Sequence, residues 1–137
     1  MMRRLCDWER RLAEYEESIR DRPFRWGTHD CASATVGAVA AITGVDVSDL
    51  LPSRRLRLFL TRVGALPLKA RNAALRLGLS ECEPRFARRG DPCIVRIPGG
   101  DCLSWIGSDG WPVVLTWSGR VRVGPDAITA AWHVPEA

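Results

Sequence analysis

The fold is decided by the stretch Arg25-Trp26-Gly27-Thr28-His29-Asp30-Cys31-Ala32-Ser33, in which an aromatic residue and a glycine end a loop just before a helix begins. Thr28 or Asp30 can cap that helix by accepting a hydrogen bond from its free backbone amides. Cys31 then falls at or near the first turn, where the positive end of the helix dipole favours the thiolate. Because the thiolate is the nucleophilic form, Cys31 is a candidate catalytic nucleophile.

The helix that follows, from Cys31 to about Ile42, is built almost entirely from Ala, Val, Thr and Gly. Small residues on all sides predict a buried helix that its neighbours approach closely, and Gly44 is the expected C-cap. In such a helix a cysteine has a second interpretation, that of a small buried hydrophobic residue.

The longer string Pro23-Phe24-Arg25-Trp26-Gly27-Thr28-His29-Asp30-Cys31 resembles the entrance to the core helix of the NlpC-type cysteine peptidases, papain-like enzymes that cut peptidoglycan stems. It is most similar to a branch found in tailed phages, prophages and gene transfer agents, whose motif reads Pro-Phe-x-Trp-Gly-x-His-Asp-Cys. The resemblance implies a papain-like α+β fold with an antiparallel sheet laid against the helix that carries Cys31. It also implies partners among tail-tip hub proteins, with peptidoglycan as a further candidate partner.

Three other segments have helical patterns. Leu5 to about Arg20 places apolar residues at three- and four-residue steps and stops before Pro23. A short turn and a helix capped by Ser53 are expected within residues 48–63, and a further helix from about Leu68 to Leu77 ends at Gly78.

The C-terminal part predicts strands. Four β-rich runs separated by short Gly-containing turns predict an antiparallel meander, and a fifth strand is expected near the end; the runs are 93–97, 102–106, 113–117, 120–123 and 131–134. The preceding Arg89-Gly90-Asp91 resembles the Gly-Asp turn that opens the sheet in the NlpC-type family. We therefore expect one domain over residues 1–137, with a helical part (1–80) and a sheet of four to five strands (90–137).

A cysteine nucleophile needs a base, and the family resemblance puts a histidine at the start of the second sheet strand. Asp101 or Cys102 occupies that place here, and a carboxylate near Cys31 would raise its pKa. The two histidines of the chain, His29 and His133, are the remaining candidate bases.

Each candidate base has a condition attached. His29 either serves as the base or holds its loop by bonding to a backbone carbonyl, whereas His133 reaches Cys31 only if the last strand borders the start of that helix. Trp26, Gly27 and Asp30 are expected to support the loop.

Composition excludes several classes of protein. The chain is 46% hydrophobic and 26% charged, which indicates a globular protein, and no apolar run approaches the ~20 residues needed to span a bilayer. Charged residues follow the first arginines before an apolar segment can form, so no signal peptide is expected. We expect the chain in the bacterial cytoplasm during assembly and afterwards in the virion tail.

Five cysteines, an odd number without Cys-x-x-Cys spacing, favour neither a disulfide framework nor a metal site, and no cofactor is expected. Between Arg54 and Arg89, ten basic residues accompany only Glu81 and Glu83. That stretch is either a solvated helix face or a surface for an acidic partner or an anionic wall polymer. It lacks the interleaved aromatic residues of a single-strand nucleic-acid platform, so no specific nucleic-acid binding is expected.

Two functions follow as hypotheses. The first is a phage tail-tip cysteine peptidase or amidase in which Cys31 attacks a peptidoglycan stem and His29 or His133 takes the proton. The second is a catalytically inactive structural or assembly component of the tail tip with the same fold. A third, a thiol-dependent acyl transferase, remains open because papain-like folds host several acyl-transfer reactions.

Overall fold

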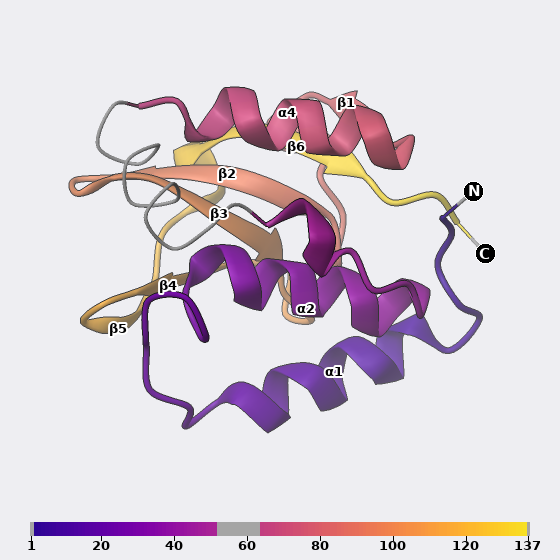
Figure 1. Ribbon diagram of the computed structural model, residues 1–137, viewed down its shortest axis with the longest axis horizontal. Coiled ribbons are helices and arrows are strands. Elements are labelled where there is room, and N and C mark those ends of the chain that lie inside the picture. The colour runs from indigo at the N-terminus through magenta and orange to yellow at the C-terminus, as the bar shows by residue number, and fades with distance from the viewer. Residues whose placement is uncertain (1, 52–63, 137) are drawn as a thin grey trace.

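The protein is described by a computed structural model that covers residues 2–51 and 64–136 (Figure 1). Within these residues it is an α+β protein with three α-helices and a six-stranded sheet. The helix predicted after Ser53 lies outside the described residues. The α-helices are α1 (Trp8–Ile19), α2 (Cys31–Thr43) and α4 (Leu66–Leu77), and the 3-10 turns are η1 (Ser48–Leu50), η2 (Pro84–Phe86) and η3 (Pro125–Ala127).

The sheet is antiparallel throughout and has the order β1-β6-β2-β3-β4-β5. The predicted meander is confirmed, since β2 to β5 follow one another in space as in sequence. The strands are β1 (Ser80–Cys82), β2 (Pro92–Ile97), β3 (Gly100–Ile106), β4 (Pro112–Thr116), β5 (Gly119–Val121) and β6 (Ile128–His133).

The expected total of four to five strands is wrong, because β1 adds a sixth. Its three residues, Ser80-Glu81-Cys82, contain no β-branched or aromatic side chain and so carry no strand pattern. β1 forms by pairing with β6, where Ser80 lies opposite His133 and Cys82 lies opposite Ala131. Local sequence periodicity cannot predict a strand that forms only through pairing with another strand.

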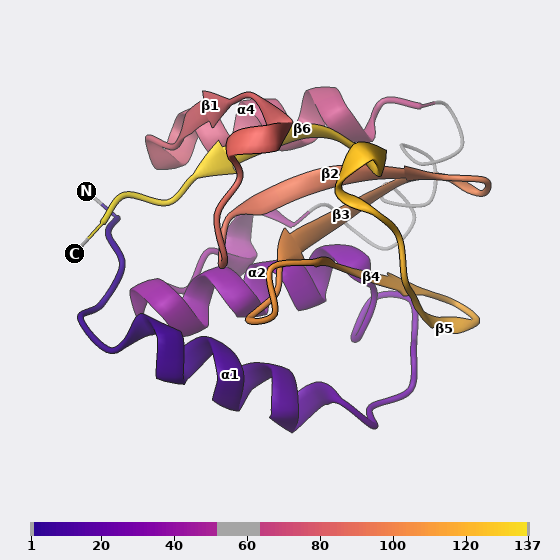
Figure 2. The same cartoon turned by 180° about the vertical axis from the view of Figure 1, so that it is seen from behind.

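Helix α2 lies between α1 and the sheet, as the two opposite views show (Figures 1 and 2). Its small side chains allow this close packing, as predicted. At Gly37 the Tyr15 ring of α1 occupies the space that a Cβ would need, and the Tyr15 hydroxyl donates to the Ala34 carbonyl (2.6 Å). Gly44 adopts a left-handed conformation (φ 73°) and caps the helix as expected.

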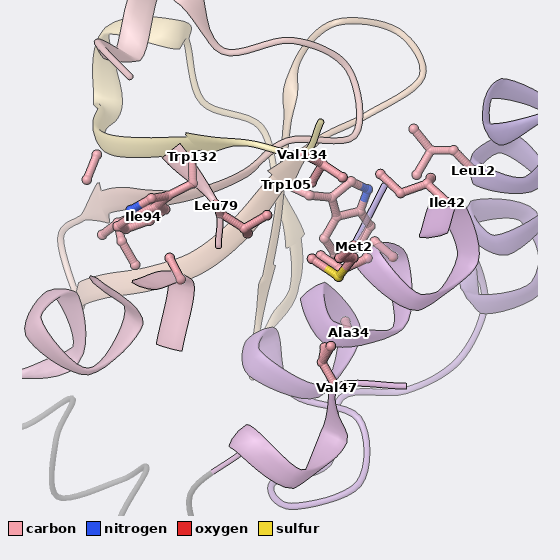
Figure 3. Packing of buried hydrophobic residues seen from close by; sticks show 14 of the residues in the cluster. Met2, Leu12, Ala34, Ile42, Val47, Leu79, Ile94, Trp105, Trp132 and Val134 are labelled. Carbon is pink, nitrogen blue, oxygen red and sulfur yellow. The ribbon is translucent and has the colours of Figure 1, made fainter. Parts of the chain in front are cut away.

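The main core forms where α1, α2 and α4 meet one face of the sheet (Figure 3). Trp105 of β3 is 1% exposed, and its Nε1 donates to Glu16 of α1 (2.9 Å). Glu16 also accepts from the Ser108 hydroxyl (2.6 Å), so α1 is fastened to the turn between β3 and β4. A second, smaller cluster on the sheet contains Cys93, Val95 and Val114, with residues beside the 3-10 turns packed against it.

A buried ion pair joins the first residues of the chain to the turn before β2. Arg4 Nη2 donates to Asp91 Oδ1 (2.8 Å), and these side chains are 1% and 0% exposed. Arg4 Nε also donates to the Val134 carbonyl (3.1 Å), and the Val134 amide donates to Asp91 Oδ1 (3.0 Å). Gly90 has φ 88°, a left-handed conformation that favours glycine. The predicted Gly-Asp turn therefore also holds both ends of the described chain.

Part of the basic stretch between Arg54 and Arg89 is neutralised by acidic residues, two of them from outside the stretch. Arg88 pairs with Glu136 (2.7 Å) and Arg89 with Glu9 (2.8 Å), while Arg71 pairs with Glu81 (2.9 Å). All three are exposed pairs, which contribute little to stability. The arginines of this stretch from Arg54 to Arg62 lie outside the described residues.

A membrane-spanning helix, one both long and apolar enough to cross a bilayer, does not occur in residues 2–51 and 64–136.

Candidate functional site

Asp30, rather than Thr28, caps α2. Its Oδ1 accepts from the Ser33 amide (2.9 Å), and the Ser33 hydroxyl accepts from the Asp30 amide (2.9 Å), which completes a reciprocal capping box. Asp30 Oδ2 accepts from the Gly27 amide (2.8 Å). One fully buried carboxylate therefore fixes both the start of α2 and the loop before it.

The loop before α2 is a tight reversal of the chain. The backbones of Arg25 and His29 bond to each other in both directions (2.9 and 2.8 Å), and Gly27 supplies the left-handed conformation (φ 89°) between them. The rings of Phe24 and Trp26 pack edge to face with their centroids 5.1 Å apart. Trp26, Gly27 and Asp30 thus lie in the loop that presents Cys31.

Cys31 is the first residue of α2, as the sequence predicted, and its partner is another cysteine. Its thiol interacts with the Cys102 side chain of β3 and with the backbone of Leu103. The bond to Cys102, followed by burial, raises the pKa of Cys31 well above its usual value. The expected preference for the thiolate is therefore wrong, because these two effects outweigh the start of the helix.

The pKa of Cys102 moves in the opposite direction. The hydrogen bond from Cys31 lowers it, while burial and the nearby Asp101 carboxylate act against that lowering. Cys31 thus keeps its proton and is the hydrogen-bond donor toward Cys102. Cys102 is the thiol of the pair that ionises first. Asp101 itself is 8% exposed and pairs with Arg96 (3.2 Å).

Both thiols open into a pocket of about 290 Å³. Apolar side chains form most of its wall, and Trp117, which is 80% exposed, stands at its rim. The lining residues come from the loop before α2 and the start of α2, from β2, β3 and the turn between them, and from β4, β5 and their turn; they are Phe24, Trp26, Cys31, Ile97, Pro98, Gly99, Asp101, Cys102, Leu115, Thr116, Trp117, Ser118 and Val121. Within the described part of the chain, this lining contains neither histidine.

His29 is buried beside basic groups. It is 3% exposed, and its Nε2 has no hydrogen-bond partner among the described residues. Burial lowers the pKa of His29, and the charges of Arg22 and Arg120 lower it further. His29 is not among the described residues that line the pocket beside Cys31.

His133 is held at the other end of the sheet. Its Nδ1 lies 2.7 Å from Oδ2 of Asp91, the carboxylate that also binds Arg4. Asp91 accepts a backbone bond from Ile106, the last residue of β3, whereas Cys102 lies near the start of that strand opposite Val95. The last strand therefore does not bring His133 to the start of α2.

Cys102 is a site residue to which the sequence assigned no role. Counting along the strand put Asp101 or Cys102 at the position of the family histidine, and the structure brings Cys102 to Cys31 there. Which of the two would bond to Cys31 depends on the packing of α2 on β3, and no local pattern reports that contact.

A cluster of three or more His, Cys, Asp or Glu side chains able to hold a metal ion is not found among residues 2–51 and 64–136.

A family model described as a domain of unknown function (DUF6950) matches residues 3–134 of the chain. No curated protein and no solved structure matches it.

We predict that alkylation of Cys31 by iodoacetamide is slow at pH 7 and rises only at alkaline pH, above the ordinary thiol pKa of about 8.5, because only the thiolate reacts. The Cys102→Ala variant removes the largest cause of the raised pKa and shifts the profile to lower pH. Rates are measured for each cysteine by peptide mass spectrometry of the folded protein.

The His133→Ala variant is the matched control and leaves the Cys31 profile unchanged. Fast alkylation below pH 7 that a histidine variant abolishes would contradict this account of the site.

Proposed function

This chain belongs to the DUF6950 family, a domain of unknown function, and we propose that it is a tail-tip protein of a tailed phage, prophage or gene transfer agent. In this proposal its NlpC-like domain is a structural or assembly component and does not hydrolyse peptidoglycan. The partners are tail-tip hub proteins. The chain is made in the bacterial cytoplasm and then incorporated into the virion tail.

The observation that carries the proposal is the identity of the group that faces Cys31. A cysteine peptidase uses a basic nitrogen to remove the thiol proton, and this nitrogen then returns the proton to the leaving amine. Here the facing group is the Cys102 thiol, which offers no basic nitrogen to remove the Cys31 proton and return it to the leaving amine. Cys31 is consequently a neutral thiol.

The NlpC-like part of the proposal rests on the motif and on the arrangement of the elements. The string from Pro23 to Cys31 opens a buried helix, and an antiparallel sheet packs against that helix. The strand position where the family resemblance expects a histidine lies against Cys31. A fold that keeps this position but changes its side chain fits a domain retained for assembly after losing its base.

The enzyme remains as a second candidate, favoured by the pocket. A cavity of about 290 Å³ beside the Cys31 thiol, with aromatic walls, is the kind of space that a peptide substrate occupies. The Leu103 amide, which donates to the Cys31 sulfur, is also a hydrogen-bond donor at the reacting position. In this alternative a base must come from the substrate or from a partner.

We predict that the purified protein releases no soluble fragments from peptidoglycan sacculi, as measured by chromatography and mass spectrometry beside an active NlpC-type enzyme. The Cys102→His variant installs an imidazole facing Cys31. It should raise the alkylation rate of Cys31 at pH 7 by at least about tenfold, the change in thiolate fraction for one pKa unit. Release of fragments by the unmodified protein, abolished in Cys31→Ala, would establish the enzyme instead.

The tail assignment has a separate test. In the strain that encodes the chain, mass spectrometry of purified particles should find its peptides in tails or in tail-assembly intermediates. A deletion should yield particles with incomplete tails, and the Cys31→Ala chain should restore them, because assembly does not need a nucleophile. A chain found only in free form, whose deletion leaves complete and infectious particles, would refute the tail role.

A further inference from the structure

The Cys31–Cys102 pair lies where two elements far apart in sequence are packed together. Cys31 begins α2, Cys102 belongs to β3, and α2 packs directly on β3. The Leu103 amide donates to the Cys31 sulfur, which places that sulfur against the backbone next to Cys102. Both side chains are partly exposed and line the same pocket, so a small molecule reaches them from one opening.

The other pair of neighbouring cysteines is too far apart for a disulfide. Cys82 of β1 and Cys93 of β2 both lie opposite Ala131, on either side of β6. Two strand spacings separate them by roughly 9.5 Å. A disulfide requires Cα atoms about 4.4–6.8 Å apart. Cys82 and Cys93 are therefore an internal control, because they should stay reduced when Cys31 and Cys102 form a disulfide.

We propose that Cys31 and Cys102 form a redox-active dithiol, which exchange with a low-molecular-weight disulfide such as oxidised glutathione converts into an intramolecular disulfide.

The exchange has two steps. The Cys102 thiolate, favoured by the hydrogen bond from Cys31, attacks one sulfur of the small disulfide, and one thiolate leaves. Cys31 then loses its proton to solvent and attacks the Cys102 sulfur of the mixed disulfide, which releases the second small thiolate. Two protein thiols are oxidised to one disulfide, and one small disulfide is reduced to two thiols.

The disulfide would tie the start of α2 to β3 across the inner wall of the pocket. In a reducing cytoplasm the pair stays as two thiols, and in an oxidising exterior it closes. A tail protein passes from the first environment to the second. The inference itself rests on the position of the two thiols and does not depend on the proposed function.

The test treats the folded protein with oxidised glutathione and maps its cysteines by mass spectrometry of a digest kept non-reduced. Exposed Cys6 reports that the oxidant is competent, because it should carry glutathione. We expect the peptide with Cys31 to be linked to the peptide with Cys102, with two free thiols lost, while Cys82 and Cys93 stay reduced. Dithiothreitol should restore both thiols.

Two variants separate the steps. In Cys31→Ser, the resolving thiol is absent, so Cys102 should retain glutathione as a stable mixed disulfide. In Cys102→Ser, the partner thiol is absent, so no intramolecular disulfide of Cys31 should form under the same conditions.

The proposal is overturned if Cys6 becomes fully modified while Cys31 and Cys102 both stay free. It is also overturned if either of them links equally well to Cys82 or Cys93, since that outcome would indicate unfolding rather than a built pair. Neither result depends on peptidoglycan or on tails, so failure here is distinct from failure of the proposed function.

Discussion

The arrangement of the site depends on the buried carboxylate of Asp30. Its two oxygens bond in different directions, one to the Ser33 amide in the first turn of α2 and one to the Gly27 amide in the loop. Helix direction and loop shape are thereby set together, and the residue that follows must sit at the first position of the helix. Because α2 packs on β3, that position brings the sulfur of Cys31 to Cys102. Loop, helix and strand meet at one point for this reason.

The chemistry of the site depends on Cys102, the residue of β3 that faces Cys31. The start of a helix favours an anion by a modest amount, typically about 0.3–1 kcal/mol at exposed positions. The interaction with the neighbouring Cys102 thiol, together with burial, acts in the opposite direction and raises the pKa of Cys31. Among the described residues that line the pocket beside Cys31 there is no histidine: His29 is buried in the loop before α2, and His133 is bound to Asp91. The helix therefore presents a thiol whose partner is a second thiol.

Local signals in the sequence predict much of the fold, and they predict the position of Cys31 at the start of its helix. Short-range patterns predict the glycines that cap α2 and α4, the start of α2 and the four-strand meander. The structure contains all of these features. Strand β1 was missed because three residues without strand propensity become a strand only through pairing with β6. Local patterns do not distinguish Asp101, Cys102 and the two histidines as partners of Cys31, because only tertiary packing decides which side chain meets the start of a helix. Likewise, the sequence around Arg4 does not predict its buried ion pair with Asp91.

The central claim is that neither histidine interacts with Cys31. The most direct measurement is an NMR titration of both imidazoles, followed through their ring carbon-bound protons, in the unmodified protein and in Cys31→Ala under reducing conditions. A histidine paired with a thiolate is held in its charged form, so losing the cysteine would move its titration to lower pH. The account predicts that the curves of His29 and His133 are the same in the two proteins. A downward shift of either curve in Cys31→Ala would contradict it and identify the base of a working cysteine enzyme.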